Sequence, residues 1–326
     1  MDIFVLVMVV ALSAVNGAND VPKGVATLAG AGVTRIRTAL IWGTLATVVG
    51  CLVSLTFASK MTKLFSKGIV SAEPTPAFAA AVLVGTASWI AFATWRSLPV
   101  STTHALVGSL LGAGALFASD SVEWGVIMGK VVQPLLLSVL VAYAISAVLA
   151  TIARAMSRRV RPPRRGGVEQ AVTESRILTY LHWLTSGLTS FSRGMNDAPK
   201  IVAIGSLALL GGMTTTHLLL AVTAAMAVGG LLVGHRIGER LAKDVIKMTH
   251  EEGFTANATT ATLVGLGAFQ GLPMSTTQVS IGAISGTAGT NLSRLKGDTV
   301  RDFLIAWLVT PPFAAVAAAA AYLILG

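Results

Sequence analysis

Two sequence motifs each occur twice in this chain, in the same order and at nearly the same spacing. GANDVPK at 17–23 recurs as GMNDAPK at 194–200, and LPVSTT at 98–103 recurs as LPMSTT at 272–277. Two ordered matches, with nearly the same separation between the copies, indicate an internal duplication. We expect a first repeat over 1–153, a linker over 154–175 and a second repeat over 176–326.

The composition places the duplication in a lipid bilayer. Hydrophobic residues make up 54% of the chain and charged residues 12%, and the mean hydropathy is +0.75; charged residues are about 25% of an average soluble domain. These values exclude a soluble enzyme, a disordered protein and a nucleic-acid-binding domain. The net charge of +10 therefore reflects membrane topology, with lipid and not nucleic acid as the partner.

Apolar runs divide each repeat into the same parts. We expect a helix broken at the first motif, a full helix, two shorter runs joined at a proline, and a last long helix. In the first repeat these are 3–16 with 22–33, 38–58, 78–95 with 101–118, and 123–152. In the second they are 177–193 with 199–211, 214–234, 255–269 with 275–291, and 300–325, with a polar stretch at 235–253.

The proline-joined runs favour a re-entrant hairpin, because a full span needs about 20 apolar residues. Each repeat then crosses the membrane an odd number of times, and the two repeats are inverted. With both termini outside, the basic linker 154–175 is cytoplasmic, as the positive-inside rule requires. The sequence thus predicts an all-α integral membrane protein with an inverted-topology repeat, broken helices and two re-entrant hairpins, which is typical of secondary transporters.

The first motif places a carboxylate inside an apolar stretch of each repeat, at Asp20 and Asp197. An ionised carboxylate is costly in hydrocarbon, so both are candidate functional residues. With Asn19 and Asn196 they offer hard oxygen ligands, and the two aspartates would bind the metal if the protein uses sodium. The alternative is that these side chains only cap the helix after the break.

The second motif presents three hydroxyls at the start of a helix in each repeat. Free N–H groups and the partial positive charge of a helix N-terminus bind oxyanions, and hydroxyls add donors without charge. We expect the two tips to meet and enclose a tetrahedral anion. The residues are Ser101, Thr102, Thr103, Ser275, Thr276 and Thr277. Ordinary capping by the two serines is compatible with this role.

Lys23 and Lys200 each follow their aspartate by three residues, within reach on one helix face. Two roles stay open: an ion pair that neutralises the aspartate, or an ammonium that occupies the place of a coupling cation or adds positive charge to the anion site. Arg96 and Arg193 adjoin the motifs, either to attract anions or only to pair. His104 follows the first Ser-Thr-Thr, where the second repeat has Gln278.

At these motifs the chain resembles the inorganic phosphate transporter (PiT) family, which is marked by duplicated Gly-X-Asn-Asp and Pro-X-Ser-Thr-Thr elements. The resemblance implies a homodimeric secondary transporter that moves phosphate with sodium or protons. By motif, Asn19, Asp20, Asn196 and Asp197 would serve substrate and coupling-ion binding, and the six hydroxyl residues would hold the anion.

The two lysines depart from the family, which commonly has asparagine at both positions. A built-in ammonium would repel or replace sodium, so we expect sodium-independent, proton-coupled symport by alternating access, in the cell membrane, with no cofactor other than the coupling ion. The nearest alternative is a sulfate permease of the same superfamily. An anion channel and an intramembrane aspartyl protease with two aspartates sharing a proton are more distant, and we expect no enzyme.

Overall fold

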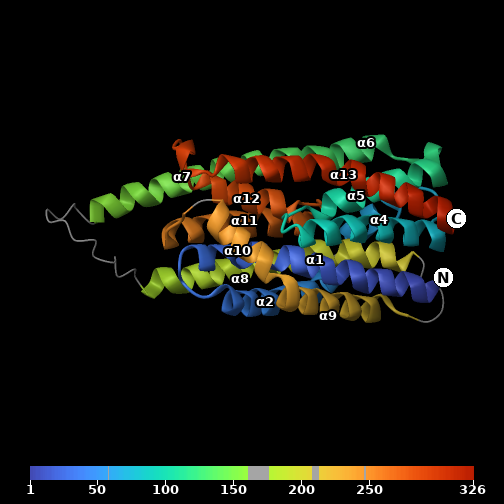
Figure 1. The fold of residues 1–326 in the computed structure, drawn as a ribbon, viewed down its shortest axis with the longest axis horizontal. Coiled ribbons are helices and arrows are strands. Elements are labelled where there is room, and N and C mark those ends of the chain that lie inside the picture. The colour runs from blue at the N-terminus through green and yellow to red at the C-terminus, as the bar shows by residue number, and fades with distance from the viewer. Residues whose placement is uncertain (58, 161–175, 208–212, 246) are drawn as a thin grey trace.

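The computed structural model describes residues 1–57, 59–160, 176–207, 213–245 and 247–326, and within them the chain is helical (Figure 1). The helices of the first repeat are α1 (Asp2–Gly30), α2 (Ile36–Phe57), α3 (Ser59–Lys63), α4 (Pro76–Trp95), α5 (Thr102–Phe117), α6 (Trp124–Val126) and α7 (Gln133–Val160). Those of the second are α8 (Arg176–Ser206), α9 (Thr215–Val233), α10 (His235–Asp244), α11 (His250–Gln270), α12 (Thr276–Gly286) and α13 (Gly297–Leu325). The all-α architecture is confirmed.

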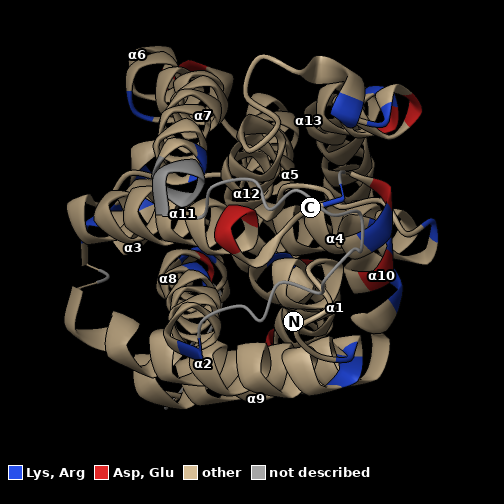
Figure 2. Cartoon of the chain, turned by 90° about the vertical axis from the view of Figure 1, so that its left-hand side faces the viewer, with Lys and Arg blue, Asp and Glu red and all other residues tan. Residues whose placement is uncertain are grey.

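Six helical segments among the described residues are long and apolar enough to cross a membrane: Asp2–Gly30, Ile36–Phe57, Pro76–Trp95, Trp124–Ala155, Thr215–Val233 and Gly297–Leu325. Charged residues are sparse along the helices and gather on α10 and near α13 (Figure 2). Helix α7 continues to Val160, past the expected end of the first repeat, and the rest of the basic linker, 161–175, lies outside the described residues.

Local sequence signals set several helix ends. Thr75 caps α4 by accepting from the Phe78 N–H at 3.2 Å, directly before Pro76, and proline suits the first helical position. Helix α11 starts with a capping box between Thr249 and Glu252. The polar stretch at 235–253 thus contains helix α10 and the start of α11.

The repeats are inverted in space. Helices α1 and α8, which carry the first motif, pack against each other and run in opposite directions along the long axis (Figure 1). Both chain termini lie at one end of this axis, and the α1–α2 turn and the start of α13 lie at the other. Which end faces the cytoplasm stays a prediction.

The repeats are also interlocked. Helix α1 packs on α9 of the other repeat, and α8 packs on α2. The hairpin α4–α5 packs on α13, and the hairpin α11–α12 packs on α7. Each repeat therefore covers the core of the other, and neither forms a separate body.

The expected break in the motif helices is wrong. Helix α1 continues through Pro22 and α8 through Pro199. Proline has no backbone N–H, so the carbonyl one turn earlier in the helix loses its usual donor. A membrane helix tolerates this loss when groups on neighbouring helices satisfy that carbonyl. The asparagines of the motif bond to the hairpins and do not cap a new helix.

The hairpins approach each other from opposite ends of the molecule, with α4 and α5 toward the end that holds the termini and α11 and α12 toward the other (Figure 1). Helix α4 is itself long enough to span a membrane, so the length of its apolar run does not decide whether it crosses the bilayer or forms part of a re-entrant hairpin. That each hairpin enters and leaves the membrane on one side stays a prediction.

Two glycines of the first motif permit the close packing of the repeats. A Cβ at Gly17 would lie 1.9 Å from the Met226 carbonyl oxygen of α9, and a Cβ at Gly194 would lie 2.4 Å from the Thr47 carbonyl oxygen of α2. Both contacts are with backbone, which a side-chain rotation cannot relieve. Only glycine fits at these crossings.

We predict that Gly17→Ala pushes α1 away from α9 and lowers the free energy of unfolding by about 1–3 kcal/mol, the usual cost of overpacking. Thermal melting in detergent measures the effect. Gly129→Ala, where a Cβ meets nothing within 4 Å, is the control. Equal melting temperatures for the two variants would contradict the interlocked packing.

Candidate functional site

The tips of the two hairpins meet at the centre of the molecule. The Thr103 hydroxyl at the start of α5 donates to the Met274 carbonyl oxygen at 3.0 Å, and the Thr277 hydroxyl at the start of α12 donates to the Val100 carbonyl oxygen at 2.7 Å. Each hairpin is thereby tied to the tip of the other. The expected meeting of the tips is confirmed in the structure.

Both hairpins present a capped helix N-terminus at this point. Ser101 accepts from the His104 N–H at 3.3 Å, and Ser275 accepts from the Gln278 N–H at 3.2 Å. Both serines are buried. The cap uses an oxygen lone pair and leaves the hydroxyl hydrogen, so capping does not prevent the serines from donating to an anion.

The motif asparagines hold the hairpin of their own repeat. Asn19 donates to Thr94 at 2.9 Å and to the Leu98 carbonyl at 3.0 Å, and accepts from the Val100 N–H at 3.0 Å. These bonds fix the turn before Ser101, so Asn19 positions the first tip.

Asn196 does the same for the second hairpin. It donates to the Met274 carbonyl at 3.0 Å and accepts from the Met274 N–H at 3.3 Å, and it also donates to Asp197 at 2.9 Å. In both repeats the asparagine amide replaces the missing backbone partners of an irregular tip buried in the core.

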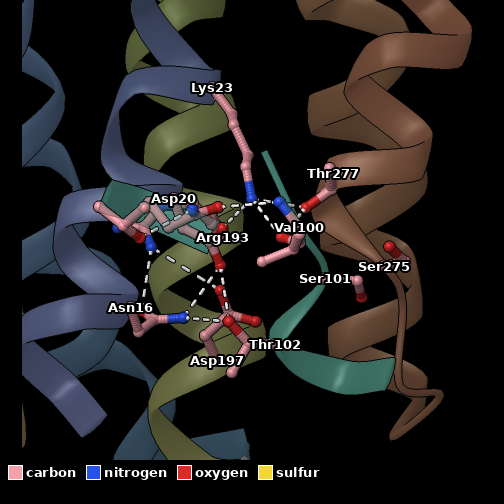
Figure 3. Close-up of polar contacts among 12 residues, drawn as sticks. Asn16, Asp20, Lys23, Val100, Ser101, Thr102, Arg193, Asp197, Ser275 and Thr277 are labelled. Atoms are coloured by element: carbon pink, nitrogen blue, oxygen red, sulfur yellow. Dashed lines mark hydrogen bonds and ion pairs between the residues drawn. The ribbon is translucent and has the colours of Figure 1, made fainter. Parts of the chain in front are cut away.

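The two lysines connect the repeats, and Figure 3 shows the contacts of Lys23. The Lys23 ammonium donates to Asp20, to the Val100 carbonyl at 2.7 Å and to the Thr277 hydroxyl at 2.5 Å. One contact is in its own helix, one in its own hairpin and one in the hairpin of the other repeat. All three N–H groups of the ammonium are thus used.

Lys200 makes the equivalent set of contacts. Its ammonium donates to Asp197 at 3.3 Å, to the Met274 carbonyl at 3.3 Å and to the Thr103 hydroxyl at 2.7 Å. The geometry is compatible with both roles left open for the lysines. Each lysine forms an ion pair with its aspartate, and each ammonium also lies among carboxylate, carbonyl and hydroxyl oxygens, the ligands that a hard cation prefers.

Residues just before the motifs complete the site. Asn16 donates to Asp20 at 2.9 Å and to Thr102 at 2.8 Å, and Thr102 donates to Asp20 at 3.1 Å. Sequence reasoning missed Asn16. This residue directly precedes the first motif, and Arg193 directly precedes the second, so the two occupy equivalent positions in the repeats. Thr276 is buried at the start of α12.

Of the two arginines beside the motifs, only Arg193 enters the site. It is 1% exposed and bonds the Thr47 hydroxyl at 2.7 Å, a contact that sequence spacing does not reveal. Arg96 is exposed and stacks on Trp95 with 5.7 Å between the guanidinium carbon and the ring centroid.

Five charged side chains are thus buried together: Asp20, Lys23, Arg193, Asp197 and Lys200. In the described part of the chain, no three or more His, Cys, Asp or Glu side chains lie close enough to hold a metal ion. The two aspartates are instead engaged by the neighbouring cations and amides.

Comparison with known proteins decides the family. Residues 16–318 match the model of the phosphate transporter family. The chain belongs to this family. As a member of a transporter family it is not an enzyme, which removes the aspartyl protease alternative, and with its apolar helices it is a multi-pass membrane protein.

Proteins of similar sequence match this chain over nearly its full length. A protein of Mycobacterium bovis named "Probable low-affinity inorganic phosphate transporter" is 28% identical, over 98% of this chain and 76% of its own. One of Bacillus subtilis with the same name is 26% identical, over 100% of this chain and 97% of its own. The fold resembles a solved structure titled "The sodium-dependent phosphate transporter", with a TM-score of 0.80, 24% identity and coverage of 99% and 98%.

We predict that Thr103→Val and Thr277→Val each destabilise the protein by about 1–3 kcal/mol, because each leaves a buried lysine N–H without its hydroxyl acceptor and removes one of the donors to a tip carbonyl. Thr44→Val is the matched control, since the Thr44 hydroxyl is buried without a hydrogen bond. Melting temperatures measure all three. A loss in the Thr44 variant equal to the others would contradict the stated role of the cross-repeat bonds.

Proposed function

We propose that the protein is a secondary active transporter that carries inorganic phosphate by proton symport, with alternating access around the site between the hairpins. The observation that carries this proposal is the meeting of two capped helix N-termini, one from each repeat, beside buried cations. Helix N-termini and hydroxyls bind oxyanions, and the family and the named relatives are phosphate transporters.

The substrate residues of this proposal are those of the two motifs. The hydroxyls of Ser101, Thr102, Thr103, Ser275, Thr276 and Thr277 face or adjoin the meeting point of the tips, and Asn19 and Asn196 hold the tips in place. Asp20 and Asp197 neutralise the lysines, so that the anion enters a polar site that is not strongly charged.

The lysines favour the proton as the coupling ion. The structurally similar protein is sodium-dependent by its title. In this chain an ammonium stands among the oxygens at both equivalent positions, where a sodium ion would meet a like charge. A fixed ammonium needs no sodium to fill that place.

Access to the site requires the tips to separate. All five charged residues and both serines are buried, so the described conformation is closed around the site. Opening to one side would break the Thr103–Met274 or the Thr277–Val100 contact while the other holds, which is how two inverted repeats alternate access. Placement in the cell membrane with both termini outside, a cytoplasmic 154–175 segment and a homodimer belong to the same proposal.

We predict that the protein in liposomes takes up labelled phosphate without sodium, driven by an inward proton gradient. A large excess of sulfate should not abolish uptake, since sulfate lacks the P–OH group that donates to a carboxylate. Strict dependence on sodium would contradict proton coupling, and uptake abolished by sulfate would favour a sulfate permease.

We predict that Ser101→Ala with Ser275→Ala weakens phosphate binding by roughly tenfold or more, because a hydrogen bond to a charged group contributes about 1.5–3 kcal/mol. Binding titrations with labelled phosphate measure it. Ser88→Ala on α4, whose hydroxyl bonds only its own helix at 3.0 Å among the contacts described, is the control. Unchanged affinity in the double variant would remove the serines from the site.

A further inference from the structure

A groove lies on the surface of the molecule between α7 and the 287–292 segment that follows α12. Its volume is about 570 Å³, which is within the range of ligand pockets, about 300–1,000 Å³. The exposed side chains of Val148 and Ile152 also line it, on a helical segment that is long and apolar enough to cross a membrane. The groove, which we call the α7 groove, therefore opens toward lipid.

The α7 side of the groove is one face of the helix. Tyr143, Ala147 and Thr151 line it at intervals of four residues, and this spacing places them above one another. Eight residues of α-helix are roughly 12 Å long at about 1.5 Å per residue. The α7 groove is thus elongated along the helix, as a binding surface for a hydrocarbon chain would be.

Two side chains of α7 fasten the helix to the other wall. The Tyr143 hydroxyl donates to the Gly289 carbonyl oxygen at 2.7 Å, and the Arg154 guanidinium donates to the Thr287 carbonyl oxygen at 2.5 Å. The backbones also meet closely, because a Cβ at Gly286 would lie 2.4 Å from the Tyr143 carbonyl oxygen. The shape of the α7 groove is therefore set by the packing of α7 on the end of α12.

Arg154 continues the groove-lining face, three residues after Thr151. It is half-buried, and a Cβ at Gly289 would lie 3.6 Å from its Nη2 atom and 3.8 Å from its Nη1 atom. The guanidinium therefore lies against the groove wall. Its hydrogen bonds go to the carbonyls of Ala150 and Thr287 and use two of its five N–H groups.

The charge of Arg154 is not balanced by an acidic side chain in the part of the chain that the structure describes. The nearby Arg294 donates to the same Thr287 carbonyl at 3.3 Å, but it is paired with the Glu252 carboxylate at 2.7 and 2.9 Å. Glu252 thus neutralises Arg294. At the end of the α7 groove, the guanidinium of Arg154 keeps both a positive charge and free N–H donors.

An apolar groove that ends at an unbalanced guanidinium matches an anionic phospholipid. Basic pockets between membrane helices bind the headgroups of anionic lipids, and arginine binds phosphate oxygens with two parallel hydrogen bonds. A zwitterionic lipid would bring its own cation toward Arg154. A second copy of this chain would have to bring an acidic residue to the same place.

We propose that the α7 groove binds one anionic phospholipid, with an acyl chain along α7 and the phosphodiester on Arg154. This inference goes beyond the proposed function and depends neither on the substrate nor on the coupling ion. Thr287 directly follows α12, whose other end carries the second hairpin tip. The bound lipid would therefore hold the base of this hairpin to α7.

Lipid-free protein in a neutral detergent tests the proposal. Native mass spectrometry counts bound lipids, and thermal melting reports stabilisation, during titration with palmitoyl-oleoyl phosphatidylglycerol or with the phosphatidylcholine of the same chains. We expect one tightly bound phosphatidylglycerol per chain and a melting temperature that rises with its concentration. Phosphatidylcholine should give neither effect, and glycerol phosphate, which lacks acyl chains, should not replace the lipid.

Three variants separate the headgroup contact from the groove. Arg154→Gln should weaken phosphatidylglycerol binding about tenfold or more, since a hydrogen bond to a charged group contributes about 1.5–3 kcal/mol, and Arg154→Lys should recover part of the loss. Ala147→Phe fills the groove and leaves Arg154 in place, so it should also weaken binding. Arg37→Gln is the control, because Arg37 is exposed on α2, on the opposite side of the molecule from α7 (Figures 1 and 2).

Three results would overturn the proposal. One is equal binding of phosphatidylglycerol and phosphatidylcholine, and another is wild-type affinity for phosphatidylglycerol in a folded Arg154→Gln protein. The third is an Ala147→Phe protein that keeps the lipid but loses its dimer, because the groove would then be an interface between copies. These measurements involve no transport, so they leave the proposed function to its own test.

Discussion

The structure depends on the need to satisfy two ammonium groups inside an apolar molecule. Lys23 and Lys200 each take one contact from their own helix, one from their own hairpin and one from the hairpin of the other repeat. A buried charge without partners costs several kcal/mol. The lysines therefore hold together four elements that lie far apart in the sequence.

The same contacts explain why the hairpins meet where they do. A tip that ends in Pro-X-Ser leaves backbone groups outside any helix, and in a core without water each must find a partner. The asparagines supply partners from the same repeat, and the threonines and lysines supply them across the repeats. The contacts that fix the tips therefore also hold in place the helix N-termini that we propose as the anion donors.

Sequence reasoning predicted the inversion of the repeats and the meeting of the two tips, because matching motifs in inverted repeats occupy equivalent places around a shared axis. The re-entrant course of the hairpins stays a prediction. Sequence reasoning failed at Pro22 and Pro199, where local propensity predicts a break and tertiary contacts preserve the helix. It did not find Asn16 or the Thr47 partner of Arg193, because an uncharged polar residue in an apolar helix has no signal of its own and a contact across α2 and α8 depends on packing. The sequence also did not predict that the helices of one repeat pack against helices of the other, because motif spacing does not determine which helices are in contact.

The interlocked packing has a consequence for how the chain is made. The first repeat is synthesised before α9, α12 and α13 exist, so α1 and its hairpin initially lack the surfaces that cover them in the finished protein. The Asp20–Lys23 pair is contained in a single helical turn, so this carboxylate and this ammonium can neutralise each other before the second repeat arrives. A neutralised pair is less costly to place in a bilayer than two separate charges, so the spacing of three residues favours membrane insertion of α1 as well as the contacts between the hairpins.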